Sequence, residues 1–258
     1  HSPLHDHGAI DWLCGVLDEH RPDVVIDLGD AYEADAASRW PSEEQFTLLD
    51  EYDEDDKVRH QIRKHARHAE LWQCMGNHDW NILDRVRLDP RLRDLCDWRR
   101  PIYTPGGYRI NEEIDNWKVK TEYRMCRRRG VCRLGQVTFG HGWDTSKFAN
   151  ARQSVTLGCP YGLSVFGHTH RPQAVERAMW GNTPLPYWSA NAGAMRDLDA
   201  HFMERKSKFL WGQACVIGEA DTRAGPSKSL RVTPQWSAET RVRCMYDEWA
   251  DAKYRGRR

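Results

Sequence analysis

Four short apolar segments of this chain end in a glycine that is followed at once by a polar residue. The junctions are Gly29-Asp30, Gly76-Asn77-His78-Asp79, Gly140-His141 and Gly167-His168-Thr169-His170. The apolar, β-branched runs before them are typical of buried strands. A glycine lets the backbone turn sharply where each strand ends. Because ligands of α/β sheets gather at strand ends, these polar side chains are expected to share one site.

Segments with helical periodicity alternate with the first of these strands, and most of the later segments are again strand-like. Helices are predicted at residues 9–19, 42–69, 79–98 (interrupted near Pro90), 146–157 and 239–253. Strands are predicted at residues 24–28, 71–75, 117–123, 131–139, 163–166, 174–179, 187–190, 211–217 and 230–232. Strands that first alternate with helices and then crowd together predict an α/β fold with two layered sheets.

The charge balance of the chain excludes some classes of protein. Its 258 residues allow one large domain or two small ones. Lys and Arg number 38 and Asp and Glu number 38, so the formal net charge is zero. A protein that coats nucleic acid or a membrane through bulk positive charge is therefore not expected. No apolar run approaches the roughly 18 residues that span a bilayer, and the first residues lack a charged-then-apolar pattern, so neither a membrane span nor a signal segment is expected. Eight cysteines without a C-x-x-C pair favour reduced thiols in a cytoplasmic protein.

The residues at the strand ends are metal ligands by type. They combine carboxylate, amide and imidazole groups, a set that suits divalent ions such as Mn²⁺, Fe²⁺ or Zn²⁺. In an extended segment, His168 and His170 would point to the same side, where both could meet one metal pair. The sequence therefore predicts a metal site.

The order of the blocks resembles the calcineurin-like metallophosphoesterase superfamily, and within it the short phosphoesterases of phage and bacterial genomes. Four of the five metal blocks of that superfamily are present in order, and Asn191-Ala192-Gly193 resembles its N-P-G turn. The resemblance covers residues 1–220. It implies a four-layer α/β/β/α sandwich of two mixed sheets flanked by helices, with metals at the carboxyl ends of the strands. Residues 221–258 are expected to add a strand, a helix and a basic tail to the same domain.

The resemblance also implies a role for each matching residue. One metal would be held by His1, Asp30 and His170, and the other by Asp30, Asn77, His141 and His168. The cofactors would be two divalent ions, Mn²⁺ in first place and Fe, Zn or Ni as alternatives, whose bridging hydroxide attacks phosphorus. His78 would give a proton to the leaving oxygen, Asp79 would orient His78, and Glu33 would support the Asp30 loop. His5 and Arg128 are candidate substrate contacts.

The first block of the superfamily, D-x-H, is incomplete in this chain. His1 occupies the place of its histidine and Pro3 follows. We therefore expect an upstream strand that supplies the aspartate. An alternative is a terminal His1 that chelates copper, as in oxidative polysaccharide enzymes, but this leaves the other blocks unexplained.

Arginine clusters bear on the substrate. They comprise Arg91, Arg93, Arg99 and Arg100, then Arg124, Arg127, Arg128, Arg129 and Arg133, and the tail at 253–258. Arginine with interleaved aromatic residues can grip backbone phosphate, so a phosphodiesterase or nuclease acting on DNA or RNA is favoured. A solvated face balanced by the acidic run at 50–56 explains the clusters equally well. Alternative functions are a phosphomonoesterase, a protein phosphatase, or an inactive metal-binding partner protein. A phage-encoded chain would act in the host cytoplasm.

Overall fold

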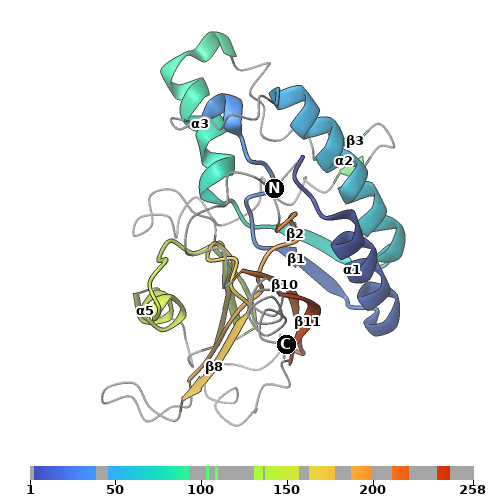
Figure 1. Ribbon diagram of the computed structural model, residues 1–258, viewed down its shortest axis with the longest axis vertical. Helices are drawn as coiled ribbons and strands as arrows, with labels where there is room; N and C mark the ends of the chain where they lie inside the picture. The colour runs from blue at the N-terminus through green and yellow to red at the C-terminus, as the bar shows by residue number, and fades with distance from the viewer. Residues whose placement is uncertain are drawn as a thin grey trace, which may run out of the picture. The chain divides into compact units, whose positions relative to one another are not determined.

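Helices and strands occur in both of the two compact units of the chain, His1–Gly130 and Val131–Arg258 (Figure 1). The computed structural model describes residues 3–38, 46–92, 103–104, 108–109, 131–135, 137–156, 163–177, 187–198, 211–220 and 237–244. The predicted α/β class is therefore confirmed. The sandwich layering and the domain boundary at residue 220 stay predictions. Within the described ranges, no helix combines the length and the apolar character that a membrane crossing requires.

The first unit is built on a pair of parallel strands. β1 (Val24–Asp27) pairs with β2 (Glu70–Gln73), so that Val24 lies opposite Glu70 and Asp27 opposite Gln73. Both strands were predicted from their apolar runs. A further antiparallel pair, β3 (Tyr103–Thr104) with β4 (Tyr108–Arg109), follows in the same unit. The strand predicted at 117–123 lies outside the described residues.

Two long helices of the first unit lie beside each other (Figure 1). α1 (His7–His20) confirms the helix predicted at 9–19 and buries Leu17 against Ala66 and Ala69. α2 (Leu48–His65) begins later than the predicted residue 42, because Thr47 and Asp50 form a capping box there. Each of these two side chains accepts a hydrogen bond from the backbone N–H of the other.

The third helix follows β2 after a connection of three residues, 74–76. α3 (Asn77–Leu88) starts directly after Gly76, and a 3₁₀ turn, η2 (Pro90–Leu92), follows it. The break was predicted at Pro90, because the residue before a proline disfavours helical backbone. Asp89 is extended there, with φ −138° and ψ 95°. A core of Ala31, Ala34, Ala37, Tyr32, Tyr52 and Ile82 joins the loop after β1 to α2 and α3.

The second unit contains a five-stranded mixed sheet in the order β5-β6-β7-β9-β8. Its strands are β5 (Val131–Leu134), β6 (Val137–Gly140), β7 (Leu163–Phe166), β8 (Gln173–Arg177) and β9 (Tyr187–Asn191). The strands β6, β7 and β9 are parallel, whereas β5 and β8 run antiparallel to their neighbours. The helix α5 (Ala149–Thr156) connects β6 to β7, within the predicted range 146–157.

The last described element corrects one prediction. Residues 239–253 were predicted to be a helix, but β11 (Ser237–Cys244) is a strand that pairs antiparallel with β10 (Gly212–Ile217). Ala238, Thr240 and Val242 alternate there with Glu239, Arg241 and Arg243. This period of two, with β-branched residues, fits a strand, and pairing with β10 outweighs the local helix propensity. Residues 230–232 and 245–253 lie outside the described ranges.

Just after β1 and β2, the chain comes so close together at Gly29 and Gly76 that neither position has room for a side chain. A Cβ at Gly29 would lie 2.5 Å from the backbone N of Gly76, and φ is +94° at this residue. A Cβ at Gly76 would lie 1.9 Å from Oδ1 and 2.4 Å from N of Asp30. The two glycines therefore allow the two strand-end loops to touch.

We expect Gly76→Ala to lower the free energy of unfolding by about 3 kcal/mol, because backbone and a buried carboxylate must shift to admit the methyl group. Gly15→Ala is the matched control, since a Cβ at this site in α1 meets nothing within 4 Å. It should stabilise the chain by about 0.5–1 kcal/mol. Urea unfolding of both variants measures this. Equal effects of the two substitutions would contradict the close approach.

Candidate metal centre

Asp30 is held in an unusual backbone conformation directly after β1. Its φ is +59° and the residue is buried. The Oδ1 atom accepts the backbone N–H of His78 at 2.9 Å, and the backbone N–H of Asp30 donates to Oδ2 of Asp79 at 3.0 Å. Left-handed backbone outside glycine often marks a functional position. These contacts fix the carboxylate at the ends of β1 and β2.

Asp79 connects the two strand-end loops. Its side chain is 1% exposed, and its Oδ2 accepts N–H groups from Gly76 at 2.8 Å and from Asp30 at 3.0 Å. The prediction assigned Asp79 to the orientation of His78, and these hydrogen bonds add a role that the prediction missed. The spacing of Gly76 and Asp79, the N-cap and N3 positions of α3, could have indicated the first of these bonds.

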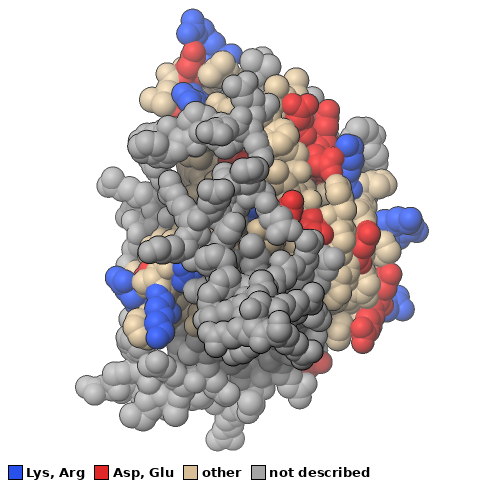
Figure 2. Space-filling model, in the orientation of Figure 1, with Lys and Arg blue, Asp and Glu red and all other residues tan. Residues whose placement is uncertain are grey.

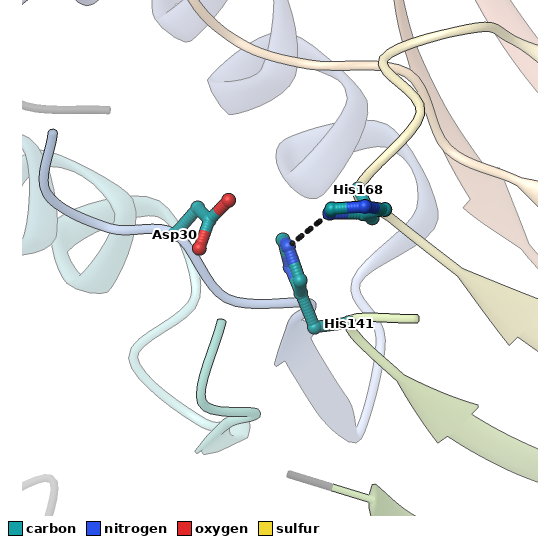
Figure 3. A group of neighbouring side chains, drawn as sticks. All are labelled: Asp30, His141 and His168. Carbon is teal, nitrogen blue, oxygen red and sulfur yellow. Dashed lines mark hydrogen bonds between the residues drawn. The ribbon is translucent and has the colours of Figure 1, made fainter. Parts of the chain in front are cut away.

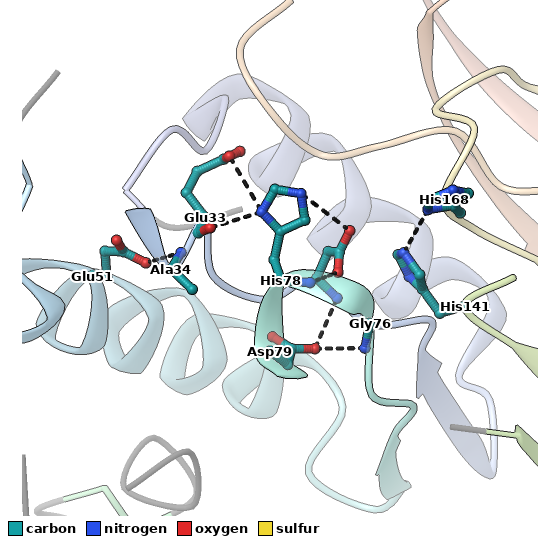
Figure 4. Close-up of polar contacts among 9 residues, drawn as sticks. Glu33, Ala34, Glu51, Gly76, His78, Asp79, His141 and His168 are labelled. Carbon is teal, nitrogen blue, oxygen red and sulfur yellow. Dashed lines mark hydrogen bonds and ion pairs between the residues drawn. The ribbon is translucent and has the colours of Figure 1, made fainter. Parts of the chain in front are cut away.

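His78 lies at the start of α3 with both ring nitrogens near acceptors (Figure 4). Its Nδ1 is 2.7 Å from the carbonyl oxygen of Glu33, so Nδ1 carries the hydrogen and donates it. Nε2 is 4.0 Å from Oδ2 of Asp30. Burial disfavours the charged ring, but the carboxylates of Asp30 and Glu33 outweigh it and raise the pKa of His78 above its usual value.

The loop after Asp30 is fixed by a buried glutamate of α2. Glu51 is 0% exposed, and one of its oxygens accepts the backbone N–H of Ala34 at 2.7 Å (Figure 4). The other accepts the backbone N–H of Asp35 at 3.1 Å. Burial raises the pKa of Glu51 to about 7, although both hydrogen bonds favour the carboxylate. The sequence analysis missed Glu51, because nothing local separates it from the other acidic residues of α2.

Two histidines of the second unit face each other. His141 follows β6 and is 1% exposed, and His168 follows β7 with φ +66°. Nε2 of His141 lies 3.2 Å from Nδ1 of His168 (Figure 3). Because β6 and β7 are parallel neighbours, their carboxyl ends bring the two rings together.

His170 has a different environment. Its ring meets Trp211 edge to face, with centroids 4.2 Å apart and planes at 79°. The φ angles of His168 and His170 are +66° and +56°. The expectation of an extended backbone at these two residues is therefore wrong, because both adopt left-handed backbone angles.

The donor chemistry fits a divalent ion. Ligand atoms of one ion with bonds of about 2.1 Å lie roughly 3–3.5 Å apart, which the 3.2 Å between the two imidazole nitrogens matches. Asp30, His141 and His168 offer one carboxylate and two imidazoles, a set that could hold a metal ion (Figure 3).

Two other candidate residues, Asn77 and His5, lie within the described ranges. Asn77 is the first residue of α3 and is half-buried. His5 is half-buried and precedes α1. His1 and Arg128 lie outside the described residues.

The charged surface has a pattern of its own. Acidic side chains gather over α1 and α2 (Figure 2), where Asp11, Asp18, Glu19, Asp50 and Asp53 are exposed. Of the first arginine cluster, Arg91 is described, and its Nη2 lies 2.8 Å from the carboxylate of Asp89. Most of the other arginines expected to bind phosphate lie outside the described residues.

In comparisons with known proteins, neither a protein-family model nor a curated protein matches this chain.

Glu51 should make stability depend on pH. Its pKa rises from 4.5 to about 7 on folding, so the folded state binds the proton more tightly than the unfolded state. The stabilisation is full below pH 4.5 and is lost as the pH rises through about 7. We expect the free energy of unfolding of wild type, minus that of Glu51→Gln, to fall by about 2–3 kcal/mol from pH 4.5 to 8.

Urea titrations across this pH range measure the difference. Asp50→Asn is the matched control on the same helix, because the Thr47 hydrogen bonds lower the pKa of Asp50, and its effect lies below pH 4.5. A difference between wild type and Glu51→Gln that does not change with pH would show that Glu51 titrates normally.

Proposed function

We propose that this chain is a dinuclear metal-dependent phosphoesterase of the calcineurin-like metallophosphoesterase type that cleaves phosphodiester bonds, with DNA or RNA as candidate substrates. The observation that carries the proposal is the 3.2 Å spacing of the His141 and His168 ring nitrogens, which suits one divalent ion. The buried carboxylate of Asp30, in a strained backbone conformation, supports it.

The proposed ligands are those that the resemblance implies. They are His1, Asp30, Asn77, His141, His168 and His170. Asp30 has two carboxylate oxygens and is the proposed bridge between two Mn²⁺ ions. When bound, such ions neutralise phosphate charge and supply a water nucleophile of lowered pKa.

The residues of the chain account for the proton transfer. Since Nδ1 of His78 donates to the carbonyl oxygen of Glu33, the ring has a fixed orientation and tautomer. Nε2 is therefore the atom that exchanges a proton with the leaving oxygen of the substrate. Asp79 and Glu51 keep the backbone on either side of this ring in place through their hydrogen bonds to N–H groups.

Asp30→Asn tests the metal assignment. We expect wild type to bind two Mn²⁺ per chain and to hydrolyse bis-p-nitrophenyl phosphate, and chelation to abolish this activity. Replacing the proposed bridging carboxylate should reduce bound metal to one ion or fewer and lower kcat by at least about 100-fold. Metal analysis and phosphodiester hydrolysis, with p-nitrophenyl phosphate and single- and double-stranded DNA and RNA in parallel, measure both.

Asp53→Asn, an exposed position of α2, is the control and should match wild type. A wild type that binds two ions but is as inactive as Asp30→Asn on every ester would favour a metal-binding partner protein. Hydrolysis confined to the monoester would favour a phosphomonoesterase.

His78→Ala should separate binding from catalysis. Because His78 is proposed to move a proton and not to bind metal, the variant should keep its Mn²⁺ and lose about 10²–10⁴-fold in kcat. His20→Ala, an exposed residue at the end of α1, serves as control. Metal loss in His78→Ala would instead make His78 a ligand.

A further inference from the structure

The helix α5 packs on its sheet through polar groups. Its buried residues include Asn150, Gln153 and Ser154. The strand residues Thr138, Ser164 and Ser189 are register partners on β6, β7 and β9, and all three are 0% exposed. The hydroxyls of Ser154 and Ser164 are hydrogen-bonded to each other. A hydrogen bond is directional, so the Ser154–Ser164 bond limits the rotation of α5 on the sheet.

One of these polar residues reaches the loop that carries His141. Gln153 is 0% exposed, and its Oε1 accepts the backbone N–H groups of Trp143 and of Asp144, the latter at 3.1 Å. Gly142 lies between His141 and this pair, with φ +91°. A Cβ at Gly142 would lie 2.7 Å from Oε1 of Gln153, so the amide is packed against the loop backbone.

We propose that Gln153 is a positioning residue that keeps the imidazole of His141 directed at that of His168. The inference rests on the proposed function, because it assigns the purpose of this orientation to metal binding. The two hydrogen bonds that Gln153 accepts from the backbone of Trp143 and Asp144 form a clamp on this loop. Gly142 is the one residue between this clamp and His141. Without these hydrogen bonds, the backbone of Gly142 could rotate more freely, and the imidazole of His141 would move with it.

The atoms of Gln153 that form hydrogen bonds determine which substitutions test this proposal. Oε1 accepts both hydrogen bonds, while Nε2 of Gln153 has no hydrogen-bond partner among the described residues. Gln153→Met keeps the length of the side chain and removes the acceptor. Gln153→Glu restores an acceptor oxygen at the same place.

The control comes from the same buried face of α5. Asn150 is one turn from Ser154 and buried, and its side-chain amide has no hydrogen-bond partner within the described ranges. Asn150→Leu therefore alters the packing of α5 without removing the Gln153 clamp. It reports how far metal binding depends on the stability of the helix alone.

The experiment compares the intact chain and these three variants by Mn²⁺ titration calorimetry, urea unfolding and amide hydrogen exchange. We expect Gln153→Met to weaken Mn²⁺ binding by about 10-fold and to speed exchange at Trp143 and Asp144. Gln153→Glu should return both toward wild type, and Asn150→Leu should change stability without changing either.

The outcomes separate the inference from the proposed function. Unchanged exchange at Trp143 and Asp144 in Gln153→Met overturns the clamp, whatever the metal affinity. Faster exchange with unchanged Mn²⁺ affinity leaves a structural loop contact and overturns the positioning role. A wild type that binds no Mn²⁺ overturns the proposed function and the positioning role together, while the exchange data still measure the hydrogen bonds of Gln153.

Discussion

The geometry at the strand ends of the first unit depends on the hydrogen bonds that the carboxylate of Asp79 accepts. One oxygen accepts N–H groups from the loops after both strands, and the side chain is buried. Removing it would leave two buried donors without this partner, each at a cost of about 1–3 kcal/mol. The close contact of Gly29 with Gly76 brings both donors to the same oxygen. The same contact directs the carboxylate of Asp30 at the N-terminus of α3, where the backbone of His78 binds it.

Residues far apart in sequence complete this arrangement, and they mark the limit of sequence reasoning. The strand ends at Asp30, Asn77, His141 and His168 were predictable, because each follows a short apolar run and a glycine. Glu51 and Gln153 were not, because their partners lie in other segments of the chain. A glutamate among many on a charged helix gives no sign that its carboxylate binds the loop after β1.

Local pattern failed where tertiary pairing decided the structure. Residues from 239 onward carry enough helix formers to predict a helix, but β10 offers a strand edge, and Ser237–Cys244 pairs with it. The turn at His168 and His170 is a second case. Alternation predicts a shared face only for extended backbone, and both residues adopt positive φ after Gly167. The helix start at Leu48 was decided by Thr47, whose side chain caps the backbone N–H of Asp50.

Among the described candidate ligands, the first unit supplies a carboxylate and an amide, Asp30 and Asn77. The second unit supplies the imidazoles of His141, His168 and His170. Contacts inside each unit orient its own donors: Asp79 and His78 for Asp30, and Gln153 for the loop of His141. Under the proposed function, these contacts hold the donors of each unit in place before an ion binds, which lowers the entropic cost of binding.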